Sequence, residues 1–447
     1  MPLYSILRWL AFLECAFLVS SAVFSSNEES ALDSYINNLI GCKDIPGLGL
    51  AVVKDDDVFT KGYGLADKEK QIKATSSTVF CVGSVTKSMT AMLLARLISS
   101  GKYRLRWTTK IKDVLGPDYT FIDDCITDSV TLEDILSHRT GLGSADILLQ
   151  AGIPEYVTRE QMMNLHPFGP SGSICASADD MTKWLKLITS KGKISEGAER
   201  IISEYVFNGQ FNIKSVLNTM WANAYSLTQP QFPVAFDSLG YGYGWFVSYY
   251  RGHRVLHHSG SLYGYSCKIT YLPDRGSAFV FFTNGPGETK FDETISPVFY
   301  YMLDLMLGYP SWLNETTACS YPAPWRNYRS KRSSQDIMLV SGKELEDMDM
   351  HTGMYSHPLY GNVTITIINN TLHISYGLLL TGKLIPTSSS FQLQLFQPLR
   401  DVFLSILNVS FQNLSIQNKY QNIEFLSLFE KYTFQGLIMM VMSAVPI

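Results

Sequence analysis

The sequence predicts an α+β protein, in which a sheet-and-helix sandwich is followed by a small C-terminal β-barrel or sandwich domain. Three observations support this fold class. Strand-like segments near the two ends of residues 30–317 are separated by a helical insert. A polar, proline-bearing connector follows at 318–346. Across 347–447, apolar and polar residues alternate with a period of two, which is typical of short strands.

The first 22 residues predict a signal peptide. Arg8 supplies a positive charge, Trp9–Phe24 is largely apolar, and Ser20–Ala22 offers small residues for cleavage. Glu14 inside the apolar run is unusual for such a peptide. We therefore expect a secreted, extracellular chain. A signal-anchored membrane protein is the alternative, although the run is short for a membrane span.

Strands and helices of the first domain follow from local patterns. Ala51–Val53 and Val58–Phe59 flank a polar turn, which predicts a hairpin. A helix is expected from Ser88 to about Leu97, because Gly101 supplies a stop signal. A second helix is expected over Met181–Ile188. Strands are then expected again at Gly244–Val247, Lys268–Tyr271 and Ala278–Phe281, the last two joined by a turn at Pro273–Gly276.

Ser84-Val85-Thr86-Lys87 is the main candidate for chemistry. A serine followed three residues later by a lysine places hydroxyl and amine one helical turn apart on the same face. A partly desolvated lysine can accept the serine proton, and a helix N-terminus favours the negative charge that develops. This is the arrangement that a Ser–Lys nucleophile pair needs. The alternative is that Ser84 only caps the helix.

Further segments accompany the Ser84 motif in an ordered series. They are Ile45–Val53, Gly62–Asp67, Thr131–Leu142, Tyr241–Trp245 and His258–Gly260. With Ser84 and Lys87, the series resembles the serine β-lactamase and penicillin-binding-protein family, in its class C-like branch of esterases, D-aminopeptidases and animal β-lactamase-related proteins. The resemblance covers roughly residues 30 to 310, within the predicted domain 30–317, and implies a β-lactamase-like fold. It also implies a hydrolase that forms an acyl-enzyme at Ser84, with Lys87 as general base.

The resemblance also assigns roles around His258-Ser259-Gly260. It implies that the backbone N–H groups of Ser84 and Ser261 form an oxyanion hole, with Ser259 and Gly260 beside the bound substrate. His258 would be a catalytic-site residue, at the position where bacterial β-lactamases carry lysine. A neutral imidazole attracts substrate carboxylates less, which favours an ester, amide or peptide substrate. The alternative is a solvated loop histidine.

One family motif is missing. Members of the family carry a Tyr-x-Asn or Tyr-x-Ser motif whose phenol relays a proton to the leaving group. Here Arg159–Leu165 resembles the segment before that motif, and Pro170–Ile174 already resembles the segment well after it. We therefore infer an internal deletion near 165–169. Tyr156 is a poor substitute because its sequence context differs. The alternative function is thus a catalytically inactive member or splice form with a binding or structural role.

The cysteines leave two interpretations open. Cys15 lies in the predicted signal peptide, so six of the seven cysteines remain in the mature chain. An even number in a secreted chain permits disulfides. Buried free thiols are an equal alternative for Cys81 and Cys267, which lie on apolar, strand-like stretches. The remaining candidates are Cys42, Cys125, Cys175 and Cys319.

Sequons predict glycosylation of a secreted surface. They begin at Asn314, Asn362, Asn369, Asn408 and Asn413. The C-terminal domain at 347–447 resembles the lipocalin-like domain often attached to this family, which implies assembly, such as a homo-oligomer, or shaping of the site entrance. The apolar stretch Leu437–Ile447 is expected to be its last strand, with the tail of a lipid-anchor signal as the alternative.

Composition excludes several classes of protein. Hydrophobic residues make up 46% and charged residues 17%, as in a globular protein, and the net charge of −4 gives no reason to expect nucleic-acid binding. The sequence contains neither a zinc-type Cys/His cluster nor a phosphate-binding glycine loop. We therefore expect no metal and no cofactor. The expected partner is a small-molecule or peptide substrate.

Overall fold

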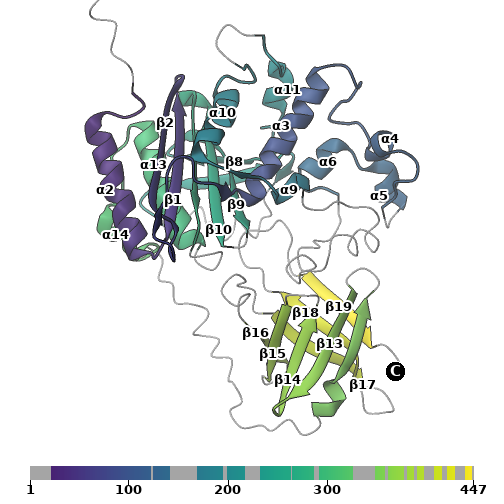
Figure 1. The fold of residues 1–447 in the computed structure, drawn as a ribbon. Coiled ribbons are helices and arrows are strands. Elements are labelled where there is room, and N and C mark those ends of the chain that lie inside the picture. Colours follow the sequence, from purple (N-terminus) through teal and green to yellow (C-terminus); the bar gives the residue numbers. More distant parts are fainter. Residues whose placement is uncertain are drawn as a thin grey trace, which may run out of the picture.

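The computed structural model has two parts, an α/β unit and a barrel (Figure 1). The described residues are 22–121, 124–140, 169–194, 199–216, 232–262, 264–285, 291–325, 348–357, 361–376, 380–386, 390–396, 407–414, 420–427 and 438–444. Within them, the first part is a nine-stranded sheet with helices on both faces, and the second is a closed barrel of β12 to β19. The fold is therefore mixed α/β, as the sequence predicts.

The sheet is antiparallel throughout its described pairs, in the order β3-β2-β1-β11-β10-β9-β8-β7-β6. Its strands are β1 (Gly47–Lys54), β2 (Asp57–Asp67), β3 (Ile72–Lys73), β6 (Ser215–Val216), β7 (Phe236–Tyr241), β8 (Phe246–Tyr250), β9 (His253–Leu262), β10 (Tyr265–Leu272) and β11 (Ser277–Thr283). Asp55 and Asp56 both have positive φ, which matches the twist of a two-residue hairpin turn. The predicted hairpin is confirmed.

Alternate residues of the central strands face two separate cores. Leu50 and Val52 of β1 pack with α2 (Ser26–Cys42) and α13 (Phe291–Leu307). Ala51 and Val53 pack on the other side, with α3 (Thr86–Ser99) and α10 (Ala178–Thr189). Both faces of β1 are buried, so its sequence is continuously apolar instead of alternating. No helix in the described ranges is long and apolar enough to cross a membrane.

Short helices complete the first part. They are α4 (Ile111–Leu115), α5 (Asp124–Ser129), α6 (Leu132–Leu136), α9 (Gly169–Gly172), α11 (Glu204–Gly209) and α14 (Glu315–Ser320). A small apolar cluster that includes Ile111, Phe121 and Leu132 holds α4 and α6 together. The predicted helix at Met181–Ile188 is α10, which begins with a capping box between Ser177 and Asp180.

Within the described ranges, core packing begins at Val23. Val23 and Phe24 are buried, and the Phe24 ring meets Phe59 edge-on at 5.1 Å. Ser25 then caps α2 in a capping box with Glu28. Residues 1–21 lie outside the described ranges, so the signal peptide stays a prediction.

Two disulfides are formed. Cys42 pairs with Cys319, which joins α2 to α14, and Cys81 pairs with Cys175. The interpretation of Cys81 as a buried free thiol is therefore wrong, because a long-range strand pair brings Cys175 opposite it. Cys267 is a buried free thiol, and burial raises its pKa well above the usual value.

The predicted connector begins too early at residue 318. Ala318 and Tyr321 are buried in the core beside α13, and Cys319 is disulfide-bonded to α2. Trp325 packs edge-on against Trp312 at 4.8 Å between ring centroids. Residues 318–325 therefore belong to the first part, held by long-range contacts that a local polar, proline-bearing pattern does not reveal. Residues 326–347 lie outside the described ranges.

The second part is an antiparallel meander that closes on itself, because β19 pairs with both β18 and β12. Its strands are β12 (Gly353–His357), β13 (Gly361–Ile368), β14 (Thr371–Tyr376), β15 (Leu380–Pro386), β16 (Phe391–Leu395), β17 (Leu407–Leu414), β18 (Tyr420–Ser427) and β19 (Ile438–Ala444). Tyr355, Val363 and Ile374 are among its buried residues. Ile438–Ala444, within the apolar stretch Leu437–Ile447, thus forms the last described strand.

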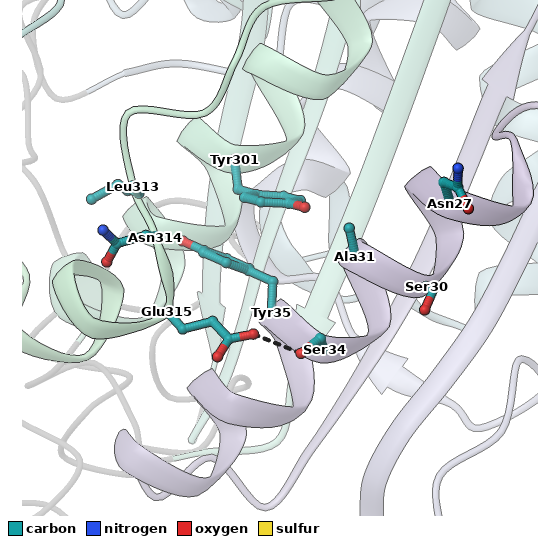
Figure 2. A pocket seen from close by; sticks show the side chains of 9 residues that line it. All are labelled: Asn27, Ser30, Ala31, Ser34, Tyr35, Tyr301, Leu313, Asn314 and Glu315. Atoms are coloured by element: carbon teal, nitrogen blue, oxygen red, sulfur yellow. Dashed lines mark hydrogen bonds between the residues drawn. The ribbon is translucent and has the colours of Figure 1, made fainter.

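Three of the five predicted sequons have described, exposed asparagines: Asn314, Asn362 and Asn369. Asn408 and Asn413 lie in β17, and their side chains are outside the described set. Asn314 also lies on a surface groove between α2 and α14 (Figure 2). There Tyr35 stacks on Tyr301 with ring centroids 3.9 Å apart. This groove is on the opposite face of the sheet from α3 and Ser84.

Candidate active site

Ser84 lies in a tight turn between a short strand and a helix. The strand β4 (Phe80–Cys81) leads into the 3₁₀ turn Gly83–Val85, and α3 follows at once. Gly83 has a φ of +51°, in the left-handed region that glycine adopts without steric cost. The helix begins at Thr86, two residues earlier than the sequence suggests, because the turn runs directly into it.

Ser84 and Lys87 are in direct contact. The Lys87 Nζ group donates a hydrogen bond of 2.9 Å to Ser84 Oγ, and a second of 3.1 Å to the carbonyl oxygen of Ser171. Both Ser84 and Lys87 are half-buried, so the pair is partly desolvated and still open to a ligand. The structure therefore brings together the two residues that the motif predicts.

Strand β9 comes close to the Ser84 turn, and glycines make the approach feasible. A Cβ atom at Gly260 would collide with the Val82 carbonyl oxygen and lie 3.0 Å from the Ser84 nitrogen. A Cβ at Gly83 would lie 2.7 Å from the Ser261 nitrogen. The Ser84 turn and β9 thus face each other, backbone to backbone, across a narrow space, and the oxyanion hole formed by the N–H groups of Ser84 and Ser261 stays a prediction. Ser259 and Ser261 are half-buried.

His258 is buried next to this space, and both of its ring nitrogens are engaged. Nδ1 lies 2.6 Å from the Ser259 carbonyl oxygen, to which it donates. Nε2 must then be the unprotonated nitrogen, and it accepts a 2.9 Å hydrogen bond from the Tyr241 hydroxyl. The alternative of a solvated loop histidine is wrong, because β9 is an inner strand of the sheet.

The charge of His258 is set by its surroundings. Burial, followed by the nearby positive charge of Lys87, lowers the pKa of His258 to about 3. The ring is therefore neutral at physiological pH. Its neighbour His257 is buried as well, with its pKa well below the usual value for the same main reason.

Tyr241 is a residue that the sequence analysis did not assign to the site. It is the first residue of the Tyr241–Trp245 motif, to which the family resemblance assigns no catalytic role. Its side chain is buried, and burial raises the pKa of its hydroxyl. The ring of His138 lies 5.2 Å from that of Tyr241. Nothing local in the sequence shows that β7 and β9 bring Tyr241 to His258.

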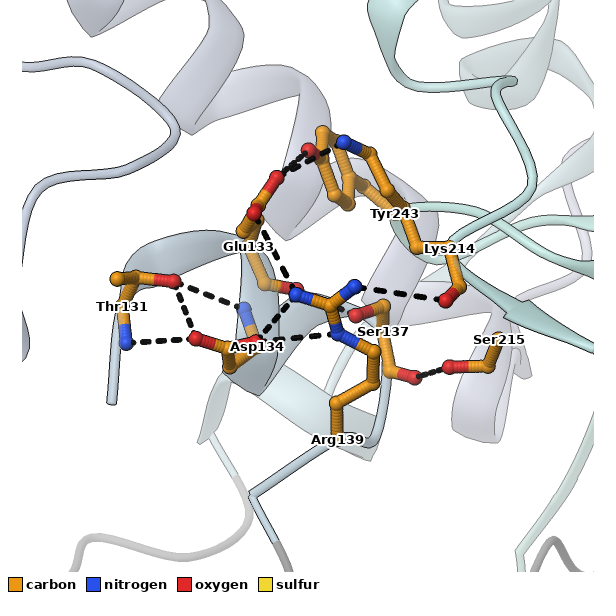
Figure 3. A network of polar contacts seen from close by, with 8 residues as sticks. All are labelled: Thr131, Glu133, Asp134, Ser137, Arg139, Lys214, Ser215 and Tyr243. Atoms are coloured by element: carbon orange, nitrogen blue, oxygen red, sulfur yellow. Dashed lines mark hydrogen bonds and ion pairs between the residues drawn. The ribbon is translucent and has the colours of Figure 1, made fainter. Parts of the chain in front are cut away.

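A network of polar contacts links α6 to Lys214 and Tyr243 (Figure 3). Glu133 accepts hydrogen bonds from the Tyr243 hydroxyl at 2.6 Å and from Lys214 at 2.9 Å. Both contacts lower the pKa of Glu133, and together they outweigh partial burial, which raises it. Arg139 forms an ion pair with Asp134 in the same network.

This network fixes two of the family-like segments against the nucleophile helix. The Gly244 nitrogen donates to the Leu136 carbonyl oxygen at 3.2 Å. Gly244 has a φ of +74°, and a Cβ there would lie 2.7 Å from the carbonyl oxygen of Lys87. The Thr131–Thr140 part of the first segment and the Tyr241–Trp245 segment therefore support the site, and Tyr241 contacts His258.

Other predicted features fall outside what can be placed. Tyr156 and the inferred deletion near 165–169 lie wholly or mostly in 141–168, beyond the described ranges. In the ranges that are described, no group of three or more His, Cys, Asp or Glu side chains is arranged to hold a metal ion.

The class of β-lactamase-like hydrolases is defined by three features that occur together here, on a sheet covered by helices. They are a nucleophile turn, a Ser–Lys contact and close packing of β9 against the turn. The beta-lactamase family profile matches residues 32–152 and 149–297, more than half of the chain. The chain therefore belongs to the beta-lactamase family.

Several known proteins are similar over shorter stretches. Unguisins hydrolase ungD' of Aspergillus campestris is 41% identical over 100 residues, which is 22% of this chain and 18% of that protein. Penicillin-binding protein 4 of Amycolatopsis lactamdurans is 34% identical over 108 residues, or 24% of this chain and 27% of that protein. The alignments thus span well under two thirds of these relatives.

Two solved structures show distant similarity to this chain. The octameric penicillin-binding protein homologue from Pyrococcus abyssi has a TM-score of 0.49 at 15% identity, covering 88% of this chain and 97% of that one. A class C beta-lactamase mutant has a TM-score of 0.44 at 15% identity, covering 62% of this chain and 97% of that one.

Proposed function

We propose that this chain is a secreted serine hydrolase that cleaves an ester, amide or peptide through an acyl-enzyme at Ser84. The observation that carries the proposal is the 2.9 Å contact between Lys87 Nζ and Ser84 Oγ, in a turn bordered by β9. Membership of the beta-lactamase family and the named hydrolases among its relatives support the same reaction class.

The residues suit the two half-reactions. The neutral Lys87 amine takes the Ser84 proton as Oγ attacks the substrate carbonyl carbon. The resulting oxyanion accepts hydrogen bonds from the backbone N–H groups of Ser84 and Ser261. As the bond to the leaving group breaks, the Lys87 ammonium returns the proton to it. Water then attacks the ester at Ser84, and the hydroxyl and the acid product are released.

The neutral His258 argues for the substrate class. Bacterial β-lactamases carry a lysine at the resembling position, whereas here the pKa of His258 is about 3 and the ring adds no charge. The His258 ring therefore does not attract a substrate carboxylate as a lysine at this position would. Neutral esters, amides and peptides fit this site better than carboxylate-bearing antibiotics. The Tyr241 hydroxyl fixes the orientation of the His258 ring.

The test is covalent labelling of the full chain with a fluorophosphonate probe. We expect a single adduct on Ser84, and none in Ser84→Ala, while the two proteins melt at the same temperature. Ser34→Ala is the matched control, because it removes an exposed hydroxyl on α2 that contacts Glu315, on the other face of the sheet. Labelling that persists in Ser84→Ala would rule out Ser84 as the nucleophile.

The second candidate is a non-catalytic binding or structural member of the family. It is favoured by the lack of a Tyr-x-Asn or Tyr-x-Ser segment between Lys87 and Pro170. General acid–base help of this kind typically contributes about 10²–10⁴-fold to a rate. Absence of any labelling of a folded, correctly disulfide-bonded chain would favour this candidate over the hydrolase.

Secretion and assembly complete the proposal. The buried Val23 and Phe24 directly follow the predicted cleavage site, and two disulfides suit an oxidising compartment. Exposed asparagines in three sequons suit glycosylation. The closed eight-stranded meander suits a lipocalin-like domain, through which homo-oligomers would assemble.

A further inference from the structure

The segment that contains α9 and β5 (Cys175–Ala176) lies along the nucleophile helix. Its Ser171 carbonyl oxygen accepts the second hydrogen bond of Lys87 Nζ, at 3.1 Å. Thr90 of α3 donates to the Pro170 carbonyl oxygen at 2.6 Å, and Thr86 accepts from the Ile174 nitrogen at 3.3 Å. The position of this segment therefore fixes where the Lys87 amine is held relative to Ser84.

Little backbone pairing holds this segment in place. Strands β4 and β5 pair over only two residues each, Phe80 with Ala176 and Cys81 with Cys175. One further bond of 2.9 Å runs from the Val82 nitrogen to the Ile174 carbonyl oxygen. Isolated strand pairs this short are marginally stable in water. The disulfide between Cys81 and Cys175 links the paired strands covalently, three residues before Ser84 and four residues after Ser171.

We propose that the Cys81–Cys175 disulfide is a positioning element for acylation. It keeps the Ser171 carbonyl oxygen against the Lys87 amine, so that Lys87 points at Ser84 Oγ. The inference rests on the proposed serine hydrolase function. Opening the disulfide releases β5 and α9, lets Lys87 swing away, and slows acylation of Ser84 while the nine-stranded sheet persists.

The bond is accessible to redox reagents. Cys175 is exposed and Cys81 is half-buried. A dithiol reductant transfers two electrons and two protons, giving two cysteine thiols and one intramolecular disulfide of the reductant. Oxidised glutathione reverses the step, because it takes up two electrons and two protons and leaves as two glutathione thiols. The hydrolase would therefore become fully competent in an oxidising compartment.

The second disulfide supplies a matched control. Cys42–Cys319 joins α2 to α14, on the opposite face of the sheet, and it too pairs an exposed with a half-buried cysteine. The experiment compares the full chain, Cys81→Ala/Cys175→Ala and Cys42→Ala/Cys319→Ala. The readout is the rate of Ser84 acylation by the fluorophosphonate probe across pH 5 to 10. Melting curves report the folded fraction of each protein.

We expect acylation in Cys81→Ala/Cys175→Ala to be slower by roughly tenfold or more per folded molecule, as for a mispositioned catalytic group. Its pH profile should shift to lower pH, because the Lys87 amine loses a hydrogen-bond acceptor that stabilises its protonated form. Cys42→Ala/Cys319→Ala should keep the wild-type rate and profile. Equal losses in both variants, or a wild-type rate and profile in the first, would overturn the proposal.

Two further measurements distinguish failure of the positioning proposal from failure of the proposed hydrolase function. Mild reduction of the folded Cys42→Ala/Cys319→Ala protein opens Cys81–Cys175 without refolding, and reoxidation with oxidised glutathione should restore the rate. Hydrogen exchange of the Val82 amide should speed up on reduction even if no probe reacts. A protein that is never labelled at Ser84 refutes the hydrolase. Unchanged exchange at Val82 refutes the positioning role, whatever the labelling shows.

Discussion

At the residue scale, the Ser84–Lys87 contact is the part of the site that the sequence predicts best. The two residues are three positions apart, so one turn of backbone is enough to bring them together. Ser171 and Tyr241 complete the surroundings of Lys87 and His258, yet they are 84 and 17 residues away along the chain. Their places depend on sheet pairing and on a disulfide, which no local pattern encodes.

Lys87→Arg tests the role of Lys87 as a base. A guanidinium stays protonated and cannot take the Ser84 proton, so acylation by the fluorophosphonate probe should fall by about 10²–10⁴-fold. Lys61→Arg is the control, since Lys61 pairs with Glu29 and Asp33 away from α3 and should retain the full rate. An undiminished rate in Lys87→Arg would show that Lys87 does not act as the base.

His257 and His258 predict a loss of stability in acid. Burial lowers the pKa of both, to about 3 for His258, from the ordinary value of 6.5. Between each lowered pKa and 6.5, the unfolded chain binds more protons than the folded chain. The free energy of unfolding therefore falls as the pH drops below about 6.5. Each group contributes up to about 1.4 kcal/mol per pH unit there.

Urea unfolding at pH 7.5 and pH 5.0 measures this loss. His257→Gln keeps a polar side chain near Ser248, the hydrogen-bond partner of His257, but does not titrate. The variant should therefore lose less stability than the wild type between the two pH values. An equal loss in both proteins would mean that His257 does not drive the acid sensitivity.

At the element scale, strand β9 contributes both to the core of the sheet and to the candidate site. His257 and His258 lie within the sheet, and Gly260 lets the strand approach the Ser84 turn. The sequence places a glycine in the third motif and predicts close approach to a bound carbonyl. The structure adds a steric reason for glycine at this position, because Gly260 lies against the backbone of the nucleophile turn itself.

Gly260→Ala should therefore damage both the site and the fold. A Cβ would meet the Val82 carbonyl oxygen and the Ser84 nitrogen, which cannot move without displacing the proposed oxyanion hole. We expect a stability loss of about 1–3 kcal/mol, as for overpacking, and a large fall in probe acylation. Gly41→Ala in α2 is the control, because no atom lies within 4 Å of its Cβ position. It should leave acylation intact.

Elements with strong local signals were predictable, and those defined by distant partners were not. The β1–β2 hairpin and α10 carry their turn and cap residues in sequence. The pairing of β4 with β5 depends on residues 94 positions apart, and the end of the first part at residue 325 depends on the Cys42–Cys319 bond and on aromatic packing. Polar and proline residues at 318–325 suggested a connector because their partners are far away in the chain.

At the scale of the whole molecule, the protein has two units with separate cores. The sheet and its helices include residues up to Trp325, and the barrel strands run from Gly353 to Ala444. In the sheet-and-helix unit, Cys42–Cys319 links α14, the last of its described helices, to α2, the first of them. A chain cut after residue 325 should therefore keep the complete sheet and the Ser84 turn.

Limited trypsin digestion of the non-reduced chain tests this division. The basic residues Arg326, Arg329, Lys331 and Arg332 follow Trp325, the last described residue of the first part, and few contacts cross a linker. The first cut should fall among them and give an N-terminal fragment that still reacts with the fluorophosphonate probe at Ser84. A second, smaller fragment should carry the barrel and remain β-rich by circular dichroism. First cleavage inside β1 to β11, or a connector that resists trypsin while the sheet is cut, would contradict two separately folded units.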